Sequence, residues 1–117
     1  MIRYADVNGR KMLPFSGGRG HCPGCGKAVI AKCGEINIDH WAHKNGENCD
    51  PWSEPLGPWH EWWQRLVRED FTEEWKGEHR ADVVGNQGTV IELQHSPIGA
   101  KDIAARENFY GQMIWLF

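Results

Sequence analysis

The sequence has no long hydrophobic run and no excess of positive charge. None of its apolar stretches approaches the roughly 18 residues that a membrane-spanning helix needs, so we expect no contact with a membrane. The N-terminus lacks the hydrophobic region of a secretory signal peptide, which favours a cytoplasmic protein. The formal net charge is −3 and the pI about 6.0. Any nucleic acid must therefore be bound by a local patch rather than by a basic surface overall.

What the chain does contain is tryptophan and cysteine. A length of 117 residues agrees with one domain, or with one small module fused to another. The seven tryptophans are expected to supply much of the core. Two of the four cysteines, Cys22 and Cys25, are separated by Pro-Gly. This spacing favours a metal site over the disulfide framework of a secreted protein.

The Cys-x2-Cys motif is followed by further sulfur and imidazole ligands. Cys22 and Cys25 have the knuckle spacing that wraps a chain around a tetrahedral ion. His43 and Cys49, in a polar stretch, can complete the coordination. A site closed by four protein ligands is structural, because no position stays open for water. The sequence therefore predicts one structural Zn²⁺ site.

Three alternatives stay open for these side chains. His40 could replace His43, because both lie near the end of the same predicted strand and periodicity does not separate them. Cys33 lies at the tip of a predicted hairpin whose second strand is 36–38, where it would be a bystander thiol. Without a metal, the simplest interpretation of the knuckle is a disulfide between its two cysteines.

Two β-rich runs flank an Asn/Gly turn in the last third of the chain. The first run, 78–84, contains Asp82, and the second, 89–96, contains Glu92 and Gln94. Strand side chains alternate between faces, so Glu92 and Gln94 share one face, and we expect Asp82 to lie opposite Glu92. Because a buried unpaired carboxylate is costly, this pair predicts a divalent-metal site.

An Asp on one strand and an acid-x-(Lys or Gln) motif on its hairpin partner resemble the arrangement of the PD-(D/E)XK nucleases. Mg²⁺ prefers oxygen ligands and keeps several waters, so two carboxylates and a carbonyl can suffice. Such an ion polarises a scissile phosphate and supplies a hydroxide nucleophile. Here Gln94 takes the usual place of Lys, so that positive charge is absent. The bare spacing also fits an ordinary amphipathic hairpin.

A run rich in tryptophan precedes the hairpin. Its apolar residues fall at helical spacing, which predicts a helix over about 59–69 with this stripe facing the core. The stripe consists of Trp59, Trp62, Trp63, Leu66 and Val67. His60 and Gln64 lie four residues apart on an adjoining face, where they can line whatever the helix covers. Glu54, just before the helix, is a further candidate.

A second helix and a last strand follow the hairpin. Residues 101–113 predict the helix, and the all-apolar run 114–117 is typical of a buried central strand. From Trp59 onward the order is one helix, two or three strands, one helix and one strand. We therefore predict an α+β or α/β fold with a minimal restriction-endonuclease-like core in residues 53–117. A β-hairpin and zinc-ribbon-like module would occupy residues 1–52.

Together these motifs resemble the competence protein CoiA-like family of bacteria and phages. The likeness covers most of the chain and is specific in combination. It is carried by Cys-Pro-x-Cys-Gly at 22–26, His-Trp-Ala-His at 40–43 with the later Cys49, Trp59-His60, Arg80–Val83, Ile91–Ser96, Arg106–Tyr110 and Met113–Trp115.

The resemblance implies a zinc-finger-like module joined to a PD-(D/E)XK nuclease-like domain that acts on DNA. By this likeness Asp82 and Glu92 hold a catalytic Mg²⁺ or Mn²⁺, and Gln94 orients water. His60 contacts the phosphate or assists proton transfer, while Arg106 steadies transition-state charge or pairs within the fold. The implied activity is a metal-dependent deoxyribonuclease in DNA processing, recombination or phage–host conflict.

A second interpretation keeps the fold without cleavage. The chain would then be a binding module or an inhibitor that recognises DNA or a protein partner. Its acidic balance favours a protein partner, because phosphate contacts usually need clustered Lys and Arg.

Overall fold

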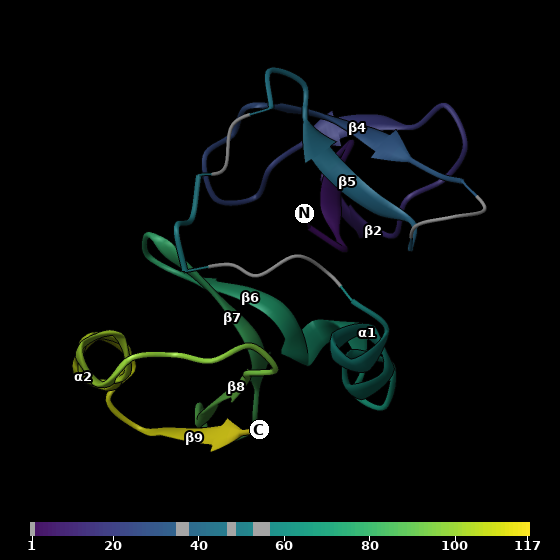
Figure 1. Ribbon diagram of the computed structural model, residues 1–117. Helices are drawn as coiled ribbons and strands as arrows, with labels where there is room; N and C mark the ends of the chain where they lie inside the picture. Colours follow the sequence, from purple (N-terminus) through teal and green to yellow (C-terminus); the bar gives the residue numbers. More distant parts are fainter. Residues whose placement is uncertain (1, 35–37, 47–48, 53–56) are drawn as a thin grey trace.

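Two β-sheets organise the protein, and Figure 1 shows the N-terminal sheet above the second one. This computed structural model describes residues 2–34, 38–46, 49–52 and 57–117. The predicted strand at 36–38 and the candidate Glu54 therefore fall wholly or partly outside the described residues. No helix among the described residues is long and apolar enough to cross a membrane.

The first sheet is antiparallel throughout, in the order β2-β1-β3-β4-β5. Its strands are β1 (Ala5–Val7), β2 (Arg10–Met12), β3 (Arg19–His21), β4 (Ala28–Lys32) and β5 (His40–His43). The turn between β1 and β2 needs a positive φ at Asn8 and Gly9, which Asn and Gly tolerate best. Asp6 closes that turn by accepting the Gly9 N–H at 2.8 Å.

A single tryptophan dominates the core of this sheet. Trp41 is completely buried and packs with Ile2, Ala5, Cys22 and Val29. Its indole Nε1 donates to the Met12 carbonyl at 3.0 Å, so the polar atom of the ring is satisfied. Because Cys22 belongs to this core, the cysteine knuckle is fixed against the sheet by packing as well as by any metal.

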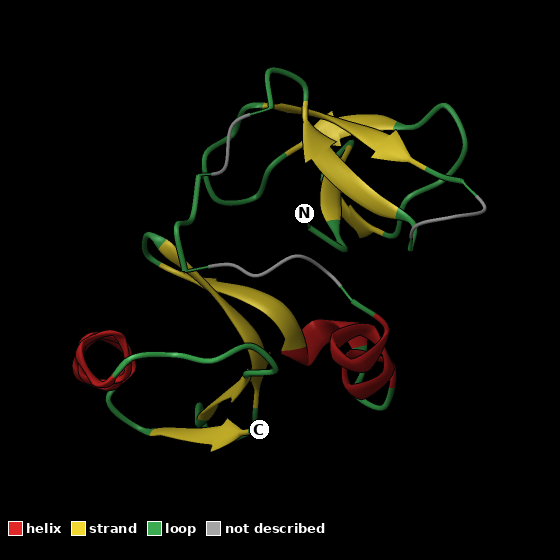
Figure 2. Ribbon diagram, viewed as in Figure 1, coloured by secondary structure: helices red, strands yellow, loops and turns green. Residues whose placement is uncertain are grey.

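The second sheet is mixed, in the order β6-β7-β8-β9. Its elements are α1 (Pro58–Arg65), the 3₁₀ turn η1 (Glu69–Phe71), β6 (Thr72–Lys76), β7 (His79–Val84), β8 (Val90–Leu93), α2 (Ala100–Tyr110) and β9 (Met113–Leu116). The strands β6, β7 and β8 are antiparallel neighbours, whereas β9 returns parallel to β8 after α2 (Figure 2). The predicted order of helices and strands from Trp59 onward is the observed one. Assignment of this part to the PD-(D/E)XK fold, and the division at residues 52 and 53, stay predictions.

The predicted phase of the first helix is wrong. The buried residues of α1 are His60 and Gln64, whereas Trp62 is 53% exposed and Leu66, just after the helix, is 63% exposed. The helix turns its polar face inward because that face hydrogen-bonds β7. Apolar periodicity fails here, since buried polar groups with partners outweigh the burial of the tryptophan stripe.

The predicted position of the last strand is also wrong. β9 lies at the edge of the sheet rather than at its centre, and Ile114 is 56% exposed. The preceding helix ends at Tyr110, so Met113 begins the strand instead of ending the helix. An all-apolar run forms a central strand only where other elements pack on both faces of the sheet and a strand pairs with each of its edges. Among the described residues, β9 pairs only with β8.

Contacts between the two sheets converge on β6. The Glu73 carboxylate accepts the backbone N–H of Arg3 at 2.8 and 3.0 Å and that of Tyr4 at 3.2 Å. Glu73 has a φ of 46°, an unusual conformation for a residue with a side chain, and lies between Thr72 and Glu74, which pair with Val83 and Ala81 of β7. Nearby, a Cβ on Gly24 would lie 2.3 Å from the Trp75 ring, so only glycine fits there.

Candidate functional site

The cysteine knuckle joins β3 to β4. Cys22 receives a hydrogen bond from Gly26 N–H to its carbonyl at 2.8 Å, and its own N–H donates to the Lys27 carbonyl at 2.9 Å. Gly26 has a φ of 75°, which a glycine adopts without strain. The turn thereby directs the thiols of Cys22 and Cys25 to one side of the chain.

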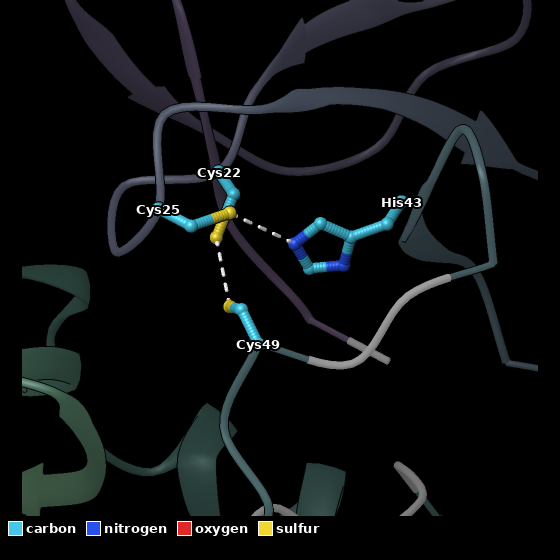
Figure 3. Close-up of side chains that lie close together, drawn as sticks. All are labelled: Cys22, Cys25, His43 and Cys49. Atoms are coloured by element: carbon cyan, nitrogen blue, oxygen red, sulfur yellow. Dashed lines mark hydrogen bonds between the residues drawn. The ribbon is translucent and has the colours of Figure 1, made fainter.

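Four side chains from three separate segments meet beside this knuckle (Figure 3). The ligand atoms of Cys22, Cys25, His43 and Cys49 all lie within 4.8 Å of one another. The Sγ atoms of Cys22 and Cys49 are 3.6 Å apart, and the Cys25 Sγ is 3.4 Å from the His43 Nε2. A tetrahedral ion with Zn–S bonds of about 2.3 Å would place two sulfurs about 3.8 Å apart. The cluster could therefore hold a metal such as zinc.

The structure distinguishes between the alternative ligands that the sequence left open. His43 lies with the cysteines, whereas the Nδ1 of His40 lies 2.8 Å from the Ile38 carbonyl at the other end of β5. Cys33 is exposed and stands apart from the cluster. Cys22 and Cys25 are free thiols. Among the described residues, no other group of three or more potential ligands is gathered so closely.

The thiols of this cluster differ in acidity. Burial, followed by the neighbouring Cys22 and Cys25, raises the pKa of the Cys49 thiol to about 12. Burial also opposes ionisation of Cys25, but hydrogen bonds from the Lys27 backbone and from the Cys22 and Cys49 thiols outweigh it and lower its pKa. Of these two thiols, Cys25 therefore ionises more readily than Cys49. A metal that binds here displaces the remaining protons.

A second group of polar side chains lies where β7 and β8 stop pairing. The recorded ladder between them ends at Val83 and Ile91. Beyond it, the Leu93 N–H donates to Asp82 Oδ2 at 2.8 Å, and the Asp82 N–H donates to Glu92 Oε2 at 3.1 Å. Each carboxylate thus accepts an amide of the opposite strand. The predicted juxtaposition of Asp82 and Glu92 is what the structure contains.

Side chains from α1 and α2 complete this acid site. The His60 Nε2 lies 3.0 Å from Asp82 Oδ1, and the Gln64 amide donates to the Asp82 carbonyl at 3.2 Å. From α2, the Arg106 guanidinium lies 3.8 Å from Glu92 Oε1. The Arg106 group also stands over the Trp52 and Trp115 rings, 5.5 and 5.9 Å from their centroids. Helix residues therefore supply a histidine on one side and a cation on the other.

The two carboxylates of the acid site have opposite proton affinities. Burial and the adjacent Asp82 raise the pKa of Glu92 to about 9. Burial also opposes ionisation of Asp82, but the hydrogen bond and charge of His60 hold its pKa below the usual range. Without a metal, the pair therefore carries one proton at neutral pH. A cation that binds between two adjacent carboxyl groups can replace the proton that the pair carries.

Gln94 lies just beyond β8 and is 4% exposed. Its backbone N–H donates to the Leu116 carbonyl at 2.8 Å and continues the pairing with β9. Its side-chain amide donates to the Ser96 carbonyl at 2.8 Å. This contact gives the side chain a defined place in the turn after β8. Whether it also orients a water at the acid site stays a prediction.

Sequence reasoning missed a third polar group, around Asp50. This carboxylate is 1% exposed, lies 2.8 Å from His79 Nδ1 and accepts the Arg80 N–H at 2.8 Å. The Trp52 ring stacks on His79 with centroids 3.4 Å apart. Asp50 directly follows Cys49, so the cysteine cluster is tied to the start of β7. Nothing in the spacing of these residues signals the contact, because the partners lie far apart in the chain.

Residues 17–51 match the family model described as Competence protein CoiA, N-terminal domain. The matched region contains all four residues of the cysteine cluster and none of the residues of the acid site. Comparison with curated proteins and with solved structures gave no match. Over residues 17–51, the family match supports the CoiA-like resemblance stated above.

Proposed function

Because the N-terminal match supports a CoiA-like assignment, we propose that the protein is a metal-dependent deoxyribonuclease whose acid site is formed by Asp82 and Glu92. One observation carries the proposal. Two carboxylates, each accepting an amide of the opposite strand, lie side by side at the end of a strand pair, with a histidine and an arginine beside them. A fold gains little from burying two adjacent acids, so their placement favours a function.

The donor set suits a hard divalent cation. Mg²⁺ and Mn²⁺ prefer carboxylate oxygens, and Mg²⁺ keeps several waters, so two protein carboxylates are enough to hold it. When bound there, the ion would polarise the scissile phosphate and lower the pKa of a water molecule. Asp82 and Glu92 would hold the ion, and Glu92 would have to release its proton to do so.

The neighbouring side chains have separate roles in this proposal. His60 fixes the orientation of the Asp82 carboxylate and can pass a proton at its imidazole. Arg106 neutralises part of the negative charge that a phosphate brings next to Glu92. Gln94 can only orient water, because an amide carries no charge. Cleavage should therefore be slower than in a site with Lys at this position.

Zinc at Cys22, Cys25, His43 and Cys49 would be structural in this proposal. All four coordination positions would be taken by protein, so no substrate or water could bind the ion. The ion would instead fix the segment that carries Cys49 and Asp50, and Asp50 contacts the start of β7. In this way the zinc module would support the strand on which Asp82 lies.

The test is incubation of the purified protein with linear, nicked and branched DNA, with Mg²⁺, with Mn²⁺ and without either ion. We expect cleavage only with a divalent ion, and we expect Asp82→Asn and Glu92→Gln to abolish it. Asp102→Asn, which removes an exposed carboxylate on α2, is the matched control and should cut like the wild type. Intact DNA of every form with both ions would overturn the proposal.

A second candidate is a binding module without cleavage. One observation favours it: the position that usually supplies a cation holds Gln94, whose amide is hydrogen-bonded to Ser96. The nuclease-like face would then recognise DNA or a protein. In that case Glu92→Gln should leave binding intact, whereas the nuclease proposal requires the loss of activity.

A further inference from the structure

A groove runs over strands β3 and β4, and none of its lining residues belongs to the cysteine cluster or to the acid site. We call it the β3–β4 groove; it has a volume of about 460 Å³. Its rim carries the side chains of Arg19, His21 and Lys44, all exposed. Ala28 and Ile30 contribute apolar surface to its lining. The groove thus combines cationic groups at its edge with short apolar side chains.

The cations of this groove differ from several others in the protein. Arg19 and Lys44 form no ion pair within the part of the chain that the structure describes. By contrast, Arg65 is paired with Glu61, Arg68 with Asp70 and Lys76 with Glu74. One carboxylate lines the groove, Asp6, and it accepts the Gly9 N–H in the β1–β2 turn. The positive charge of the rim is therefore available to an outside anion.

Charge is divided unequally along the chain. Residues 1–52 contain seven Lys and Arg against five Asp and Glu, a formal charge of +2. Residues 53–117 contain six Lys and Arg against eleven Asp and Glu, a formal charge of −5. The part that carries the acid site therefore repels a polyanion as a whole. A DNA substrate needs an attractive surface elsewhere, and the zinc module is where the positive charge lies.

We propose that the β3–β4 groove binds the phosphate backbone of a DNA strand. This inference rests on the proposed nuclease function. Residues 1–52, which carry the groove, would bind the DNA that the acid site cuts. Arg19 and Lys44 contact phosphates, while Ala28 and Ile30 lie against the apolar faces of the sugars. Because such contacts go to the backbone, they carry no base sequence. Binding is thus independent of sequence and sensitive to salt.

The experiment measures binding of a short fluorescent single-stranded oligonucleotide by anisotropy over a range of salt concentrations. The protein carries Asp82→Asn throughout, so that no cleavage occurs, and no divalent ion is added. The groove variant is Arg19→Gln with Lys44→Gln. The matched control is Arg68→Gln with Lys101→Gln, which removes the same charge from exposed positions outside the groove. Zinc content and thermal unfolding verify that each variant is folded.

We expect the groove variant to bind about tenfold more weakly at physiological salt. The slope of log K against log salt should fall by about 1.4 in magnitude, the value for two phosphate contacts on a single strand. The control variant should bind like its parent. Equal losses in both variants, an unchanged groove variant, or no binding by the parent would each overturn the groove. So would a polyglutamate peptide that competes as well as DNA does.

Failure of this inference can be told apart from failure of the proposed function. If the parent binds through the groove but the protein with native Asp82 cuts no DNA, the nuclease proposal fails and the groove stands. If the enzyme cuts DNA and the groove variant cuts it with an unchanged KM, the groove fails and the nuclease proposal stands.

Discussion

The two halves of the molecule use opposite means to bring polar ligands together. In residues 1–52, the four side chains of the cysteine cluster come from a turn, a strand end and a later loop, so three different local structures position them. In the second part, Asp82 and Glu92 are brought together by strand register. Each carboxylate accepts a backbone N–H of the opposite strand, Glu92 from Asp82 and Asp82 from Leu93. A turn motif can be recognised in the sequence because its residues are close together in the chain. A contact between two strands depends on how the strands pair, which the sequence indicates only indirectly.

The comparison predicts that losing a cysteine ligand has the largest effect. Cys22→Ser removes both a metal ligand and a side chain that is 1% exposed in the core of the first sheet. Metal binding in small modules is coupled to folding, so we expect loss of bound zinc and unfolding of the first sheet. Zinc analysis and thermal unfolding measure the two effects.

Cys33→Ser is the control, because Cys33 is exposed and outside the cluster. It should keep the wild-type zinc content and unfolding temperature. If Cys33→Ser strips the metal while Cys22→Ser retains it, the ligand assignment is wrong. Freshly purified protein without stoichiometric zinc would contradict the metal itself.

The second prediction concerns pH and the acid site. Glu92 has a pKa raised from 4.5 to about 9 in the folded chain, where Asp82, Arg106 and Tyr110 surround it. The folded chain therefore holds a proton that the unfolded chain releases. Metal-free protein should lose stability as pH rises from about 4.5 to about 9, at up to about 1.4 kcal/mol per pH unit.

Glu92→Gln tests this directly, because the amide mimics the protonated acid. The difference in unfolding free energy between the wild type and Glu92→Gln should grow across that pH range, in favour of the variant. Mn²⁺ should remove most of the difference by stabilising only the wild type. A difference that does not change with pH would show that Glu92 is ionised in the folded chain.

The third prediction concerns the contact between the two sheets. Glu73→Gln replaces a buried carboxylate by a neutral amide and so weakens the hydrogen bonds that it accepts from the N–H groups of Arg3 and Tyr4. Hydrogen bonds to charged groups contribute about 1.5–3 kcal/mol, so we expect a loss of that order in denaturant unfolding. Glu74→Gln, at the next position, removes only a contact with Lys76 near the surface and should cost less than about 1 kcal/mol. Equal costs would show that the inter-sheet contact adds nothing.

Much of the fold could be predicted because its signals are local. The Cys22 and Cys25 knuckle, the Asn8 and Gly9 turn and the order of elements after Trp59 all follow from short spacings. What could not be predicted depends on tertiary partners. Asp50 finds His79 only once both sheets are placed, and the edge position of β9 depends on what covers the sheet. Local rules carry no information on either.

The smallest expected effect is the loss of stability on truncating Trp62 of α1. It tests directly whether local apolar spacing predicts which face of a helix is buried. The apolar stripe alone would make Trp62 a core residue, and its truncation would cost about 3–5 kcal/mol. In the structure Trp62 is 53% exposed, so we expect Trp62→Ala to cost less than about 1 kcal/mol in denaturant unfolding. Trp41→Ala, at a fully buried ring, is the matched control and should cost the full 3–5 kcal/mol or so. A large cost at Trp62 would mean that the tryptophan face, and not His60 and Gln64, is turned toward β7.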